Sequence, residues 1–166
     1  MLEPRGLRGR LPEGHQHREH RPAEPRLPGG PGRPAEDGLK LLAFVALGGA
    51  VGAVARYGVG GWVHGATGAG FPWGTLAVNV AGCFLLGLAT PILQASIATP
   101  EARAFVAVGV LGGFTTFSTF SFEAMALVQD GQWARAASYT FGSVGLGLIA
   151  VFAGYWLGAL LLEWRA

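Results

Sequence analysis

The sequence predicts an all-α integral membrane protein with four transmembrane helices per subunit, because charged residues are scarce and four long apolar stretches follow one another with short gaps. Only 13% of the residues are charged and 51% are apolar, whereas soluble domains carry roughly 25% charged residues. Residues 39–166 hold only five Lys or Arg and four Asp or Glu. These charges are too few to cover a soluble globule, and a charge at the bilayer centre costs at least roughly 2.5–3.5 kcal/mol.

Residues 1–38 differ sharply in composition from the rest of the chain. They hold seven of the ten Pro, seven Arg and six acidic residues, without apolar periodicity. Such a segment buries too little apolar surface to offset the entropy lost on ordering. We therefore expect a disordered N-terminal tail over 1–38, itself a candidate for an over-extended gene start, followed by a four-helix domain over 39–166. The tail is not a signal peptide, because no apolar core follows a short basic start.

The four spans are expected at about residues 39–62, 73–97, 102–128 and 133–162. Each exceeds the roughly 20 residues that a helix needs to cross about 30 Å of hydrocarbon. The short connections predict that successive spans are antiparallel neighbours. An even number of spans places both termini on the same side of the membrane.

Glycines spaced four apart mark the faces on which these helices should pack. Gly48 and Gly52 lie on one face of the first span, and Gly154 and Gly158 lie on one face of the fourth. Small residues at this spacing allow two helix backbones to approach closely within a membrane. Close packing is the expected role of most glycines after residue 38.

The middle of the third span, residues 109–123, reads Gly-Val-Leu-Gly-Gly-Phe-Thr-Thr-Phe-Ser-Thr-Phe-Ser-Phe-Glu. Paired glycines weaken a helix, and Thr and Ser offer the backbone alternative hydrogen bonds. Non-helical backbone at this depth is tolerated only where protein or a cavity surrounds it. One interpretation is therefore a helix break whose freed carbonyls coordinate a small hard cation. The other is a kinked helix whose hydroxyls bond back to their own backbone, and the sequence favours neither.

Uncharged polar groups in three spans are candidates for an ion path. Phe117 and Phe120 share a helix face with Ser121 beside them, and aromatic ring edges carry a partial positive charge. Asn79 can donate hydrogen bonds to an anion without trapping it by charge. The simpler interpretations are an aromatic core for the rings and a structural bond between helices for the amide.

Further polar residues extend this set. Tyr139 and Ser143 lie four apart, hence on one face of the fourth span, and they either continue a polar track or bond to a neighbouring helix. Arg56 either attracts anions at a vestibule or snorkels to the headgroups. Glu123 is expected to have a structural or vestibule role, and an Arg56–Glu123 ion pair is one possibility. No catalytic motif accompanies these residues, and no basic stripe with interleaved aromatic residues indicates nucleic-acid binding.

Four blocks of sequence together resemble one family, the CrcB/Fluc fluoride channels. They are Gly-Gly-xx-Gly-xxx-Arg-Tyr (48–57), Gly-Thr-Leu-xx-Asn-xx-Gly (74–82), Gly-Gly-Phe-Thr-Thr-Phe-Ser-Thr-Phe-Ser-x-Glu (112–123) and Tyr-xxx-Ser (139–143). The likeness covers about residues 39–162, and the third block is highly specific. It implies a dual-topology dimer of two antiparallel four-helix subunits in a bacterial plasma membrane, with two fluoride pores and passive export of cytoplasmic fluoride that confers fluoride resistance.

The resemblance also assigns roles to residues. It implies a structural Na⁺ at the dimer interface, held by the backbone carbonyls of Gly112 and Thr115, and a vestibule role for Arg56. The residues expected along the pores are Asn79, Thr116, Phe117, Thr119, Phe120, Ser121, Tyr139 and Ser143.

The tail bears on the choice of partner. Its seven arginines favour cytoplasmic termini, which raises a heterodimer with an oppositely oriented paralogue as an alternative to a homodimer. A small antiparallel multidrug exporter is the alternative function, but that mechanism needs an acidic residue in mid-membrane, and spans one, two and four have none at their centres.

Overall fold

The computed structural model describes residues 34–68, 70–95 and 98–164, which belong to one compact unit. Its helices give four segments that are long and apolar enough to cross a membrane, Glu36–Thr67, Trp73–Ala95, Pro100–Gln129 and Trp133–Glu163. The predicted four-span architecture is confirmed. The elements are α1 (Pro34–Thr67), α2 (Trp73–Ala95), α3 (Pro100–Arg103), the π-helix η1 (Ala104–Leu111), α4 (Gly112–Phe114), α5 (Phe117–Gln129) and α6 (Trp133–Glu163).

The first helix is longer at both ends than the sequence predicts. It begins at Pro34 instead of about residue 39 and ends at Thr67 instead of about residue 62. Proline fits the first turn of a helix, and Glu36 and Asp37 there complement the positive end of the helix dipole. Residues 34–38 therefore belong to the first helix, and the rest of the predicted tail, 1–33, lies outside the described residues.

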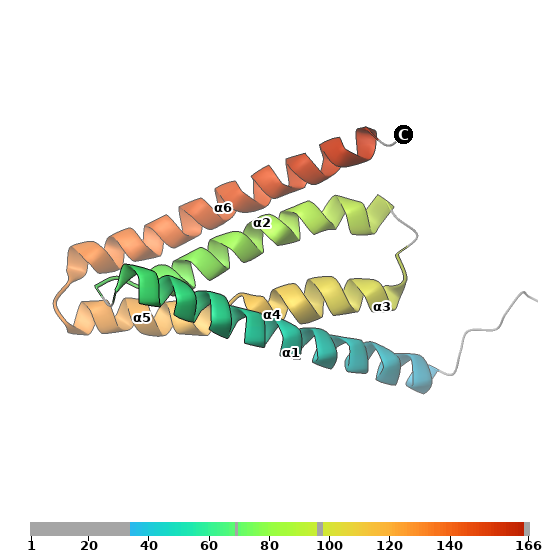
Figure 1. The fold of residues 1–166 in the computed structure, drawn as a ribbon, viewed down its shortest axis with the longest axis horizontal. Coiled ribbons are helices and arrows are strands. Elements are labelled where there is room, and N and C mark those ends of the chain that lie inside the picture. Colours follow the sequence, from blue (N-terminus) through green and yellow to red (C-terminus); the bar gives the residue numbers. More distant parts are fainter. Residues whose placement is uncertain (1–33, 69, 96–97, 165–166) are drawn as a thin grey trace, which may run out of the picture. The chain divides into compact units, whose positions relative to one another are not determined.

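Alternate spans of the chain pack together most extensively (Figure 1). Helix α1 runs alongside η1 and α4 of the third span, and α2 runs alongside α6. The members of each pair run in the same direction, because consecutive spans alternate in direction. The start of α1 and the end of α6 consequently lie at the same end of the unit, as an even number of spans requires.

Glycines form the seam between α1 and the third span. A Cβ atom at Gly48 would collide with the carbonyl oxygen of Phe105, and one at Gly52 with that of Val110. From the other side, a Cβ at Gly113 would come within 2.7 Å of the carbonyl oxygen of Gly49. The small-residue face predicted at 48 and 52 is confirmed, because only hydrogen side chains let these backbones touch.

A second glycine seam joins α2 to α6. A Cβ at Gly87 would collide with the carbonyl oxygen of Val151, and one at Gly154 with that of Phe84. At Gly158 it would meet the carbonyl oxygen of Leu88 at 2.5 Å. The predicted packing face at 154 and 158 is therefore confirmed, and Gly87 completes it from α2.

The third span is interrupted at Thr115 and Thr116. These residues have extended backbone, with φ −82° and ψ 156° at Thr115 and φ −149° and ψ 115° at Thr116. Thr116 then caps α5, because its side chain accepts a hydrogen bond from the N–H of Thr119. The structure therefore contains the helix break, which is one of the two interpretations that the sequence left open. The π-helical turns of η1 before it were not predicted, and such wide turns are frequent at functional sites.

Most large apolar side chains point outward. The buried cluster is small and consists of Phe120, Leu127, Ala136 and Tyr139, whereas exposed apolar residues line α1 and α6. A single subunit therefore presents an apolar surface that lipid or another membrane-embedded chain must cover.

Candidate functional site

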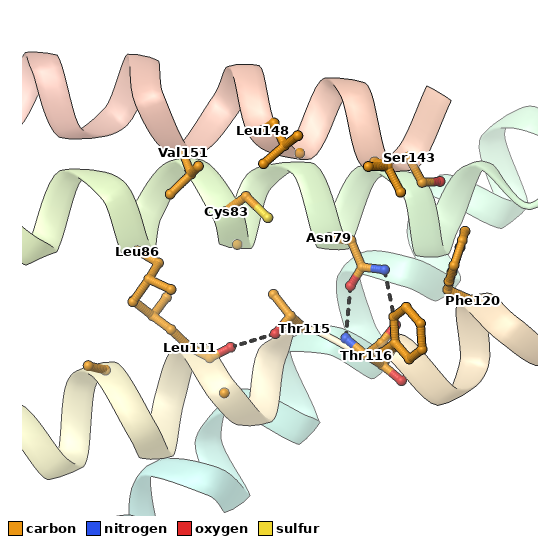
Figure 2. Close-up of a pocket in the computed structure, with 16 residues that line it drawn as sticks. Asn79, Cys83, Leu86, Leu111, Thr115, Thr116, Phe120, Ser143, Leu148 and Val151 are labelled. Carbon is orange, nitrogen blue, oxygen red and sulfur yellow. Dashed lines mark hydrogen bonds between the residues drawn. The ribbon is translucent and has the colours of Figure 1, made fainter. Parts of the chain in front are cut away.

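Asn79 on α2 holds the broken backbone of the third span. Its Nδ2 donates to the carbonyl oxygen of Thr116 at 3.0 Å, and the N–H of Thr116 donates to its Oδ1 at 2.8 Å. Figure 2 shows the side chain spanning the gap between α2 and the break. The structural bond between helices that the sequence allowed is thus present. The second proton of Nδ2 remains available on the side chain.

Two carbonyls at the break lose the donors that a continuous helix would give them. In a helix the N–H of Thr116 would donate to Gly112, four residues earlier, but it donates to Asn79 instead. The N–H of Thr119 would donate to Thr115, but it donates to the hydroxyl of Thr116 at 3.3 Å. Within the described part of the chain, the carbonyl oxygen of Thr115 receives only a long contact of 3.5 Å from Nη1 of Arg56.

The chemistry of these two carbonyls fits a small hard cation. Backbone oxygens freed from helical bonding are the ligands that Na⁺ uses in broken membrane helices, and each carbonyl oxygen has two lone pairs. Among the described residues, no cluster of three His, Cys, Asp or Glu could hold a metal. Gly112 and Thr115, the residues expected to hold the cation, could therefore bind it only through their backbone carbonyl oxygens.

A cavity of about 430 Å³ lies between the break and helices α2 and α6. Polar side chains and aromatic rings line one part of it, and Cys83, Leu86, Leu111, Leu148 and Val151 line the other (Figure 2). The described residues at the cavity wall include no Asp, Glu, His, Lys or Arg. The polar and aromatic lining residues are Asn79, Thr115, Thr116, Phe117, Phe120 and Ser143.

The hydroxyl of Ser143 is the least satisfied group in this cavity. Its Oγ is buried and has no hydrogen-bond partner among the described residues. An unpaired buried hydroxyl costs free energy unless water or a ligand occupies the neighbouring space. Ser143 can therefore donate to whatever enters the cavity.

Phe117 and Phe120 form a pair with very different surroundings. Their ring centroids are 5.5 Å apart and the rings are tilted by 44°, yet Phe117 is 78% exposed and Phe120 is 8% exposed. Phe120 also packs on Tyr139 at a centroid distance of 5.2 Å. Both rings line the cavity, one fixed by the core and the other projecting from the subunit.

Tyr139 bonds to a neighbouring helix, which is one of the two roles that the sequence allowed. It does not line this cavity, and its hydroxyl donates to Oε2 of Glu123 at 2.6 Å. Thr75 donates to Oε1 of the same carboxylate at 2.9 Å. Tyr139 and Ser143 share a helix but not a continuous polar track, because Tyr139 points into the core.

The hydrogen bonds of Glu123 also answer the question of its partner. The carboxylate is bonded to Thr75 and Tyr139, while Arg56 contacts the carbonyl of Thr115. The possible Arg56–Glu123 pair is not formed.

The sequence analysis did not select Thr75 as a site residue. Thr75 lies four residues before Asn79 on the same helix face, and this spacing was a usable signal.

A second cavity, of about 580 Å³, lies on the α1 side of the break. Its one cationic side chain, Arg56, lies among hydroxyl groups and one indole. The other polar-capable lining residues are Tyr57, Trp62, Thr75, Thr116 and Thr119. Thr116 lines both cavities. The expected vestibule position of Arg56 is compatible with this placement.

The hydroxyls of the third span divide between the two interpretations that the sequence left open. Ser121 bonds back to the carbonyl oxygen of Phe117 at 2.9 Å, and Thr115 to that of Leu111 at 3.1 Å. Thr116 instead joins the hydroxyls of Thr119 and Ser118 at 3.0 and 3.3 Å. Ser121 lines neither cavity, so the structure does not bring it together with the other expected pore residues.

Comparison with known proteins places this architecture in one family. The family described as CrcB-like protein, Camphor Resistance (CrcB), matches residues 43–155, which include every site residue above. A fluoride-specific ion channel FluC from one strain of Thermus thermophilus is 53% identical over 125 residues, covering 75% of this chain and 98% of the relative. The protein of the same name from a second strain of that species is 54% identical, with 71% and 94% covered, and that from Rhizobium meliloti is 52% identical, with 68% and 91% covered. The family match covers more than half of this chain, and the relatives are this similar along nearly their whole length. The protein therefore belongs to the CrcB family.

Proposed function

We propose that this chain is a subunit of a fluoride-selective channel that lets cytoplasmic fluoride leave the cell passively and so confers fluoride resistance. The observation that carries the proposal is the cavity at the break, which offers amide, hydroxyl and aromatic groups and no acidic or basic side chain. Relatives at 52–54% identity bear the name fluoride-specific ion channel, and this supports the same ion here.

The chemistry of the cavity suits a small, strongly hydrated anion. Such an ion must exchange its water for close hydrogen-bond donors, and the free Nδ2 proton of Asn79 and the hydroxyl of Ser143 are two of these. The ring edges of Phe117 and Phe120 add a weak electrostatic attraction. Without a fixed cation in its wall the cavity does not trap the ion, and a negative-inside potential drives an anion outward with about 2.3 kcal/mol per 100 mV.

The working channel in this proposal is an antiparallel dimer. Phe117 projects from the subunit with 78% of its surface exposed, which leaves it free to complete an ion path against a second chain. One subunit supplies two freed carbonyls, and a hard cation takes more oxygen ligands than two. A second copy or a paralogous subunit would supply the others, with Na⁺ as the structural ion between Gly112 and Thr115 of each chain. The assembly would lie within the lipid of a bacterial plasma membrane.

The alternative function, a small multidrug exporter, is less compatible with these contacts. That mechanism exchanges protons and cations at an exposed mid-membrane carboxylate. Glu123 lies on the third span, but Thr75 and Tyr139 occupy both of its oxygens, and it lines neither cavity.

Fluoride efflux from liposomes tests the proposal. Liposomes that contain the purified full chain are loaded with fluoride, and a fluoride electrode records release after a potassium ionophore removes the opposing voltage. We expect rapid release of fluoride and no comparable release of chloride, and we expect Phe117→Ile and Asn79→Asp each to slow the release severely. Liposomes that retain fluoride, both with this chain alone and with a co-purified paralogue, would refute the proposal.

A further inference from the structure

We propose that Asn79 is a positioning residue for the sodium site, in addition to lining the ion path: by accepting the N–H of Thr116 it keeps the carbonyl of Gly112 free to bind the cation. This inference rests on the cation included in the proposed function. It assigns to a side chain of the second span a role at a site built from the backbone of the third.

The first step of the argument is the competition for one donor. The N–H of Thr116 can have one of two acceptors, depending on the backbone conformation. In a continuous helix it would donate to the carbonyl of Gly112, and in this structure it donates to Oδ1 of Asn79. The observed bond of 2.8 Å goes to Asn79. As long as it does, the Gly112 carbonyl has lost its helical donor.

The second step is what happens without the amide. A buried backbone N–H must be paired, and leaving one unpaired costs about 1–3 kcal/mol. With an apolar residue at position 79, the nearest way to pair the N–H of Thr116 is to restore its bond to Gly112. That change would extend α4 across the break and remove one cation ligand.

The third step is that the other ligand is freed independently. The N–H of Thr119 donates to the hydroxyl of Thr116, so the carbonyl of Thr115 stays released whatever residue occupies position 79. Loss of Asn79 should therefore weaken the site by removing one of its two ligand types. Partners that orient ligand groups from outside the coordination shell typically change metal affinity by about 10–100-fold.

Two substitutions at this position separate the acceptor from the rest of the side chain. Asn79→Asp keeps an oxygen that can accept from Thr116, whereas Asn79→Leu keeps the approximate shape without any acceptor. The readout is the sodium concentration that gives half of the maximal thermal stabilisation of the purified protein in detergent, with N-methylglucamine replacing sodium. Ser143→Ala is the matched control, because Ser143 lines the same cavity and has no bond to the break.

We expect the half-maximal sodium concentration to rise about tenfold or more in Asn79→Leu and to stay near or below that of the unchanged protein in Asn79→Asp and Ser143→Ala. Asn79→Ala repeats the comparison if the leucine variant does not fold. An unchanged sodium requirement in the apolar variants, or an equal rise in the aspartate variant, would overturn the proposal. A chain that conducts fluoride but has no sodium requirement would overturn it together with the proposed structural Na⁺, while leaving the proposed fluoride conduction intact.

Discussion

The hydroxyl of Tyr139 on α6, a residue with 1% of its surface exposed, donates to Oε2 of the half-buried Glu123 on α5 at 2.6 Å. Thr75 on α2 satisfies the other carboxylate oxygen. Three helices thus meet at one acidic side chain. The contact explains how an acidic residue is accommodated in a span of a proposed anion channel, because two hydroxyls satisfy Glu123 and it lines neither cavity.

Removing this hydroxyl should destabilise the subunit. Tyr139→Phe leaves one oxygen of the half-buried Glu123 without its donor, and an unsatisfied polar group costs up to about 1–3 kcal/mol where it is buried. We expect a lower melting temperature in detergent. Tyr155→Phe is the control, because Tyr155 lies on the same helix with 46% of its surface exposed. Equal melting temperatures for the two variants would contradict the structural role of the Tyr139 bond.

The two phenylalanines should respond differently to the same change. Phe120→Ile removes a buried ring that packs on Tyr139, and the lost ring–ring contact alone is worth about 0.5–1.5 kcal/mol. Phe117→Ile changes an exposed ring, so the subunit should keep nearly all of its stability. We expect both variants to slow fluoride efflux and only Phe120→Ile to lower the melting temperature appreciably. A larger loss of stability in Phe117→Ile would contradict the exposed position of this ring in the subunit.

The glycine seam between α2 and α6 should not tolerate a methyl group. In Gly154→Ala the new Cβ meets the backbone carbonyl oxygen of Phe84, which cannot rotate away. The helices must separate, at a cost of about 1–3 kcal/mol, as is usual for overpacking.

Gly145→Ala is the matched control for this seam, since a Cβ there meets nothing within 4 Å. It should be neutral or slightly stabilising, because alanine favours the helix by up to about 1 kcal/mol over glycine. Thermal melting of the two variants in one detergent gives the comparison. A seam that accepts alanine at 154 without loss would contradict the close approach of α2 and α6.

The charge of Arg56 should speed anion entry. In Arg56→Gln the second cavity loses its cationic side chain, and fluoride efflux should fall severalfold at low ionic strength. The difference should shrink as salt rises, because the screening length falls to about 8 Å at 0.15 M.

Arg103→Gln provides the comparison for Arg56, because Arg103 is exposed and lines neither cavity. It should leave efflux close to that of the unchanged chain. A defect in Arg56→Gln that persists at high salt would instead point to the contact with Thr115 as the main contribution of Arg56.

Much of the fold followed from local sequence properties. The four spans were predicted because length and apolarity act through neighbouring residues. The Gly-Gly-Phe-Thr-Thr segment indicated an irregular helix before Phe117, but it left a break and a kink both open. The start of the first helix was misplaced by five residues, since Pro34, Glu36 and Asp37 resembled the composition of the tail. The π-helical turns of η1 left no signal in a uniformly apolar stretch.

The candidate site was predicted less completely than the fold. The sequence selected Asn79, Phe117, Phe120 and Ser143, and the structure brings all of them to one cavity. The sequence allowed Tyr139 to bond to a neighbouring helix and Ser121 to bond back to its own backbone, but it did not favour these roles over a place along the pore. Both side chains have the same chemistry as true cavity residues, and only the direction in which each helix faces distinguishes them.

The sequence by itself determined that this chain spans a membrane four times and carries an uncharged polar segment in its third span, because apolar length and glycine content act locally and need no partner. Only the tertiary structure decided which polar groups share a cavity, because that depends on glycine seams that fix the rotation of each helix against its neighbour. It also decided that the N–H of Thr116 pairs with Asn79, 37 residues earlier, and not with Gly112. A backbone donor at a break takes the acceptor that packing brings within reach, and no local pattern specifies that choice.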